Sequence, residues 1–307
     1  MGIIAVIQRK LLEIEESNQE FIARTLHKVH SNLGGLFVKF LDEQIRAIED
    51  TKVKIKKRKG VIAFIRIFPI FSVAIENMLV SADDLDIRET VNNAYHRINK
   101  TMFESLKIIA RENTGILESG AGGIGLGLEN KEELNHQILL IENMNHYLEE
   151  VDPRRNPVLE EWKEKAAQEF DENLGRYVAA VMSRPLKHLL LFLDSVETAM
   201  LTLAEGVPRS TIAQNSRQSK IAFQQILAEH DSKYVRNGIS ALKKRVEKHF
   251  GDADDPGLSR ALVAKVLEAC ERYFDDVDER VRAISSDVYD GVPTIEWTKS
   301  DISSSFR

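Results

Sequence analysis

Apolar residues recur every three or four positions along most of the chain, and this period constrains the fold more than any other feature. Such spacing places the apolar side chains on one face of an α-helix. No stretch alternates between apolar and polar residues for long enough to build a sheet. The sequence therefore predicts an all-α protein, an elongated rod of stacked antiparallel helical bundles. The apolar stripes cover 41–55, 64–79, 91–109, 134–148, 159–181, 189–203, 221–228, 234–250 and 258–273.

Glycine and proline interrupt the helical period at a few places, and these breaks suggest the domain bounds. Six of the 16 glycines fall within 115–127, so we expect a glycine-rich loop at about 113–129. A second break ends at Asn156 and Pro157, the cap and first residue expected of a new helix. Beyond about Ser285 the chain turns polar and serine-rich. The predicted parts are a helical bundle over 1–150 that includes the loop, a C-terminal helical bundle over 151–290 and a polar tail over 291–307.

Composition narrows the functional class. The chain has 48 acidic and 42 basic residues, a formal charge of -6, so affinity for an anionic partner requires a local cluster of bases. A single cysteine, Cys270, excludes an intrachain disulfide and indicates a reducing compartment, the cytosol; we expect a buried, inert thiol. No apolar run reaches the roughly 20 residues of a membrane span. The first apolar residues have no natural helix cap before them, so we expect the chain to begin inside a helix of a larger protein.

Motifs that would support catalysis or cofactor binding are weak. Residues 120–125 match the GxGxxG string, but a helical pattern precedes them and no helix start follows, so we interpret them as a loop and not as a nucleotide site. His27 and His30 could share a helix face, and His136 and His146 lie nearly three turns apart, yet neither pair has a third ligand at metal-site spacing. We therefore predict no catalytic residues, no metal and no cofactor.

A cluster of bases is the strongest signal of function. It places six bases in eight positions immediately before Gly60. Some of them could simply complement the negative end of a helix that Gly60 closes. The functional alternative is an anionic partner, either an acidic protein surface or a phosphoinositide-rich membrane. Nucleic acid ranks below both, because further basic or aromatic platforms are missing. The candidate contact residues are Lys52, Lys54, Lys56, Lys57, Arg58 and Lys59.

The apolar segment that follows the bases, residues 61–71, has two readings. Phenylalanines beside basic residues are typical of helices that lie on a membrane surface. However, Phe64, Phe68, Phe71 and Ile75 keep the spacing of a buried stripe, which favours core packing.

Several blocks of the sequence are long enough to be specific. They are 54–60 running into 64–71 (KIKKRKG and FIRIFPIF), 135–147 (NHQILLIENMNHY), 156–162 (NPVLEEW), 184–186 (RPL), 246–252 (VEKHFGD) continuing through Asp255, and 296–302 (EWTKSDI). Together they resemble one protein family, the Sec-three subunits of the exocyst. The similarity begins near Gly35, and the first thirty or so residues and the glycine-rich loop stay unplaced.

This resemblance implies a non-enzymatic subunit of stacked helical bundles that tethers secretory vesicles to the plasma membrane before fusion in exocytosis. Other exocyst subunits are then the expected partners, and the location is cytoplasmic and peripheral at plasma membrane sites of secretion. The family's N-terminal region, which binds lipid and Rho-family GTPases, has no counterpart here, so GTPase binding does not carry over. We expect a C-terminal fragment. The alternative is a peripheral membrane module that binds anionic phosphoinositides through the basic helix end.

Overall fold

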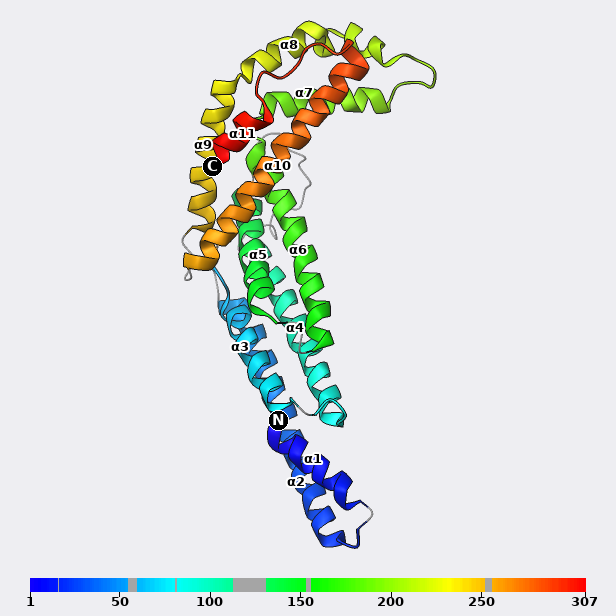
Figure 1. Ribbon diagram of the computed structural model, residues 1–307, viewed down its shortest axis with the longest axis vertical. Coiled ribbons are helices and arrows are strands. Elements are labelled where there is room, and N and C mark those ends of the chain that lie inside the picture. The colour runs from blue at the N-terminus through cyan, green and yellow to red at the C-terminus, as the bar shows by residue number, and fades with distance from the viewer. Residues whose placement is uncertain (16, 55–59, 81, 113–130, 153–155, 252–255) are drawn as a thin grey trace. The chain divides into compact units, whose positions relative to one another are not determined.

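The computed structural model describes residues 1–15, 17–54, 60–80, 82–112, 131–152, 156–251 and 256–307. These residues form helices and connecting turns, with no strand among them, which confirms the predicted all-α class (Figure 1). Two short 3₁₀ helices, η2 and η3, join α7 to α8. The bounds are α1 Gly2–Ile14, α2 Glu20–Lys54, α3 Ala63–Met78, α4 Asp86–Glu112, α5 Lys131–Glu150, α6 Pro157–Met182, α7 Lys187–Leu201, η2 Arg209–Gln214, η3 Ser216–Gln218, α8 Lys220–Glu229, α9 Ser232–Phe250, α10 Pro256–Tyr289 and α11 Lys299–Phe306.

Helix ends lie where local chemistry places them. The Asn156 side chain accepts a hydrogen bond from the backbone N–H of Val158 at 2.9 Å, and α6 begins at Pro157, as predicted. Helix α9 ends at Phe250 with Gly251 as its C-cap. α1 begins without a side-chain cap.

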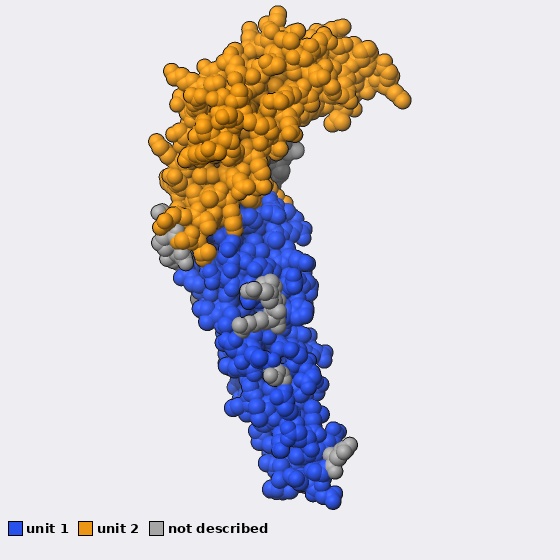
Figure 2. All heavy atoms as spheres, viewed as in Figure 1, with its two compact units in different colours: residues 1–120, 135–172 blue, residues 121–134, 173–307 orange. Residues whose placement is uncertain are grey.

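The chain divides into two compact units (Figure 2). Unit 1 comprises residues 1–120 and 135–172, and unit 2 comprises 121–134 and 173–307. The bounds predicted from the sequence and the rod arrangement stay predictions. The predicted glycine-rich loop at 113–129 lies outside the described residues.

Unit 1 is built around an aromatic cluster in its core. Phe68 of α3 stacks on Tyr147 of α5 with ring centroids 5.9 Å apart, and it meets Tyr95 of α4 edge to face at 6.0 Å. Phe103 lies between Tyr147 and Trp162, with centroids 5.3 and 5.2 Å away. Burial raises the pKa of both tyrosines, so they stay neutral and act as apolar bodies with one polar end.

A buried polar network joins α3, α4 and the residue before α6. Glu76 of α3 is buried and receives a guanidinium N–H from Arg88 of α4 at 2.7 Å. Its other carboxylate oxygen accepts from the Tyr95 hydroxyl at 2.9 Å and from the Asn156 side chain at 3.3 Å. Burial by itself lowers the pKa of Arg88, but its bonds and charge interactions with Glu76 and Asp83 outweigh that effect and raise it. The network thereby satisfies a carboxylate that burial alone would destabilise.

Unit 2 packs α7, α9, α10 and α11 together with the short α8. Arg280 of α10 holds Glu197 of α7 with two parallel hydrogen bonds of 2.8 and 2.7 Å, and it also reaches Asp194 at 2.6 Å. These bonds raise the pKa of Arg280 above its ordinary value, and burial opposes them. Phe192 of α7 stacks on Phe223 of α8 with ring centroids 4.9 Å apart. Polar clamps and ring contacts therefore hold the helices of this unit together.

The segment predicted as a polar tail, 291–307, contains a helix that its composition did not predict. Thr298 caps α11, because its hydroxyl accepts from the N–H of Asp301 while the Asp301 carboxylate accepts from the N–H of Thr298. Ile302 and Phe306 of this helix are buried, and α11 packs against α9 and α10.

None of the helices in the described part of the chain combines the length and apolar character that crossing a bilayer requires.

Candidate functional site

The basic cluster predicted as the contact site lies mostly outside the described residues. Lys52 and Lys54 belong to the last turn of α2, and only their backbone is described. Lys56, Lys57, Arg58 and Lys59 are not described. Their role stays a prediction, and the structure bears on it through the residues on either side.

The residue that follows the bases is fixed to α5. Gly60 has a φ of 94°, a left-handed conformation that favours glycine. Its N–H donates to the Glu142 carboxylate, and its carbonyl accepts from the Asn143 side chain at 3.2 Å. Asn143 also accepts from the N–H of Ile62 at 2.8 Å. These bonds set the backbone just before α3.

Sequence reasoning did not single out Glu142 and Asn143 as anchors. Both are buried on α5, within a stretch where nearly every neighbour is buried too. The available signal was the occurrence of polar residues inside that apolar stretch, since buried polar groups need hydrogen-bond partners.

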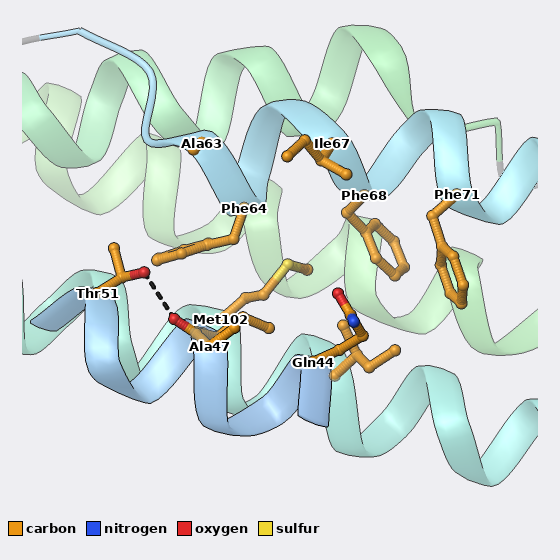
Figure 3. A pocket seen from close by; sticks show the side chains of 11 residues that line it. Gln44, Ala47, Thr51, Ala63, Phe64, Ile67, Phe68, Phe71 and Met102 are labelled. Carbon is orange, nitrogen blue, oxygen red and sulfur yellow. Dashed lines mark hydrogen bonds between the residues drawn. The ribbon is translucent and has the colours of Figure 1, made fainter. Parts of the chain in front are cut away.

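A groove opens between α2 and α3 beside this anchor (Figure 3). It has a volume of about 210 Å³ and a mainly apolar lining. Thr51, the last described side chain before the bases, lies at one end of it, and α4 also contributes to the lining. The lining residues are Gln44, Ala47, Ile48, Thr51, Ala63, Phe64, Ile67, Phe68, Phe71, Ile98 and Met102.

Helix α3 carries two apolar stripes, of which one is buried. Phe64, Phe68 and Ile75 are buried, which confirms the core-packing reading of the predicted stripe. Phe71 is half-buried and lies 6.3 Å from the ring of Phe40 on α2, measured between centroids. Ile67 and Ile70, spaced three apart, are exposed, and Ile67 lines the groove. The buried stripe therefore holds α3 in the bundle, and the exposed one forms a surface that a partner can contact.

The single cysteine and the two histidine pairs singled out in the sequence all lie within helices. Cys270 is buried, as predicted, and burial raises its pKa to about 12, so the thiol is a poor nucleophile. His27 is exposed and His30 is half-buried on α2, and His136 and His146 are half-buried on α5. No group of three or more metal-binding side chains occurs among the described residues.

Comparison with known proteins identifies the family. A family model described as exocyst complex component Sec3, C-terminal, matches residues 1–291. The chain belongs to this family. The Sec-three resemblance read from the sequence blocks is thereby confirmed, and the match also includes the first thirty residues, which the blocks did not cover.

The chain has relatives in several organisms. The exocyst complex component 1 of Mus musculus is 23% identical over 92% of this chain, and that of Drosophila melanogaster is 21% identical over 87%. The component from Dictyostelium discoideum is 23% identical over 90% of the chain. This Sec-three family chain spans only 27–28% of the length of these relatives. No solved structure is significantly similar to it.

Proposed function

We propose that the chain is a non-enzymatic part of an exocyst subunit and that it helps to tether secretory vesicles to the plasma membrane before fusion. The observation that carries the proposal is the match to the Sec-three family over residues 1–291. Relatives named exocyst complex component 1 align with about nine-tenths of the chain. On this proposal the partners are other exocyst subunits, and the location is cytoplasmic and peripheral at sites of secretion.

The architecture supports a scaffold. Both units are helical, and their charged side chains make structural pairs, such as Arg88 with Glu76 and Arg280 with Glu197. Binding surfaces between proteins are typically apolar in the centre and polar at the rim. The lining of the α2–α3 groove is mainly apolar, like the centre of such a surface. We therefore assign function to surface contacts.

Co-purification tests the proposal. The tagged chain is expressed in cells that contain the complete exocyst, and the recovered proteins are identified by mass spectrometry. We expect exocyst subunits to be recovered with the wild-type chain. A variant with Ile67→Asp, which places a charge in the groove at an exposed site, should recover less; Ile221→Asp, at an exposed apolar site of unit 2, is the matched control. Recovery of the chain alone would contradict the proposal.

A second candidate is a peripheral module that binds anionic phosphoinositides. Six bases in eight positions support it, and each base near an anionic surface contributes about 1 kcal/mol. Liposomes containing phosphoinositide provide the test by flotation. We expect charge reversal of residues 56–59 to abolish flotation. A variant with four reversed charges elsewhere gives the same net charge and should still float. The control lysines are Lys100, Lys131, Lys220 and Lys233, which are all exposed. Equal flotation of both variants would refute lipid binding through the basic cluster.

A further inference from the structure

A second apolar face runs along α2, separate from the face that holds Leu41 and Ile48 in the core of unit 1. Its residues follow each other at spacings of four, three, four, three and four, the repeat of a coiled-coil seam. The run of large apolar residues ends at Phe40, because the next position of the repeat is Glu43. We call this face the α2 seam; it consists of Ile22, Leu26, Val29, Leu33, Leu36 and Phe40.

The α2 seam is largely uncovered. Leu36 is 62% exposed, and Ile22, Val29 and Phe40 are also exposed, while Leu26 and Leu33 are half-buried. By contrast, Leu41 and Ile48 on the packed face of the same helix are 3% and 8% exposed. An apolar row of this length on one helix exceeds the scattered apolar residues of an ordinary surface.

The seam continues into the α2–α3 groove. Phe40, its last residue, contacts Phe71 of α3 through their rings. Ala47 lies four residues after Glu43, at the following position of the repeat, and lines the groove together with Ile67 of α3. The seam and the groove therefore form one mainly apolar surface, which extends over about 40 Å of helix at 1.5 Å per residue.

The charges beside the seam have one sign. In a coiled coil, the residues that flank the apolar positions face the flanking residues of the partner helix. On α2 these flanking positions include Lys39 and Arg46, both exposed, and no acidic residue. The basic cluster follows directly along the chain. A helix with acidic flanking residues is therefore complementary to this surface, whereas a second copy of α2 would bring only further bases and neutral residues to the flanks.

We propose that the α2 seam and the adjoining groove bind an amphipathic α-helix of another protein, with a three-four apolar repeat and Asp or Glu at its flanking positions. The apolar repeat of the partner would interdigitate with the seam, and its acids would pair with Lys39 and Arg46. The inference rests on the proposed function in one respect: it names the kind of segment through which a partner subunit would meet this chain.

Two synthetic peptides test the proposal. Both contain four heptads with Ile and Leu at the apolar positions; one carries Glu at the flanking positions and the other carries Lys. Binding to the full chain is measured by fluorescence anisotropy. We expect the Glu peptide to bind the wild-type chain more tightly than the Lys peptide. Lys39→Glu combined with Arg46→Glu should reverse this preference.

Helix α2 offers a matched control for the apolar contact. Leu36→Asp should weaken binding of the Glu peptide about tenfold or more, because it places a charge at the centre of the seam. Val38→Asp makes the same kind of change at a 46% exposed residue, about 200° around the helix from Leu36, and should leave binding unchanged. Circular dichroism checks that both variants are folded, and Val29→Asp replaces Leu36→Asp if the latter is not.

Several results would overturn the proposal: no binding of the Glu peptide, equal binding of both peptides, or equal effects of Leu36→Asp and Val38→Asp. Sedimentation provides one more. If the wild-type chain is a dimer that Leu36→Asp dissociates and Val38→Asp does not, the occupant is a second copy. Peptide binding in the expected pattern without recovery of exocyst subunits would instead refute the proposed function and leave this inference standing.

Discussion

Arg88 makes two ion pairs of nearly equal length that should differ widely in their effect on stability. Its guanidinium lies 2.7 Å from Glu76 and 2.8 Å from Asp83. The Glu76 side chain is 4% exposed, while that of Asp83 is 80% exposed. Removing one partner of a buried pair leaves an uncompensated charge, whereas an exposed pair is screened by water.

The loss of stability expected for Arg88→Met depends on the hydrogen bonds that Glu76 retains in the variant. Loss of one partner from a buried ion pair costs about 3–5 kcal/mol. Glu76 would still accept hydrogen bonds from Tyr95 at 2.9 Å and from Asn156 at 3.3 Å, so we expect a value near the lower end, about 3 kcal/mol. Asp83→Asn removes only the exposed pair and should cost about 1 kcal/mol or less.

Urea unfolding followed by tryptophan fluorescence measures these costs. The chain has two tryptophans, and Trp297→Phe leaves Trp162 as a reporter of unit 1. All variants are compared in this background. Adding Glu76→Gln to Arg88→Met should recover part of the loss, because the unpaired carboxylate is then gone. If Arg88→Met costs no more than Asp83→Asn, or the double variant loses the sum of the single effects, the reasoning from burial is wrong.

Three further changes have defined outcomes. Asn143→Ala leaves the N–H of Ile62 without its partner and should destabilise unit 1 by about 1–3 kcal/mol in the same urea assay. Thr298→Ala removes a helix cap and should cost about 1 kcal/mol, with faster amide hydrogen exchange confined to α11. Cys270 has a folded-state pKa of about 12, above its ordinary value of 9.0, so its contribution to stability is complete below pH 9.0 and is lost as the pH rises toward 12. Wild type should therefore lose more stability than Cys270→Ala between pH 9 and 10; parallel curves would contradict this assignment.

Much of the fold was predictable because helices leave a local signal. The three-four spacing of Phe64, Phe68, Phe71 and Ile75 identified the packed face of α3. The Asn156-Pro157 pair identified the start of α6. Helix α11 was missed because its serine-rich composition masks two apolar residues, Ile302 and Phe306, spaced four apart.

The candidate site was less predictable, because its contacts join residues far apart in the sequence. Asn143 lies 81 residues from Ile62, to which it is bonded, and no local pattern specifies such a pair. Periodicity also cannot tell a covered apolar stripe from an uncovered one, since Phe68 and Ile67 are both apolar. Only tertiary packing separates them.

The two stripes of α3 imply that polar substitutions have different effects on the two sides of the same helix. A polar residue at Phe68 should destabilise the chain both in purified form and in the cell, because it disrupts the core. A polar residue at Ile67 or Ile70 should be harmless to the purified chain, since both side chains are already in water. In a living cell, selection would still act on these two positions if a partner covers them. Some positions would then accept a polar residue without loss of stability in the purified chain, although cells that carry the same substitution are selected against. Such positions would identify the face of the helix that is used for assembly.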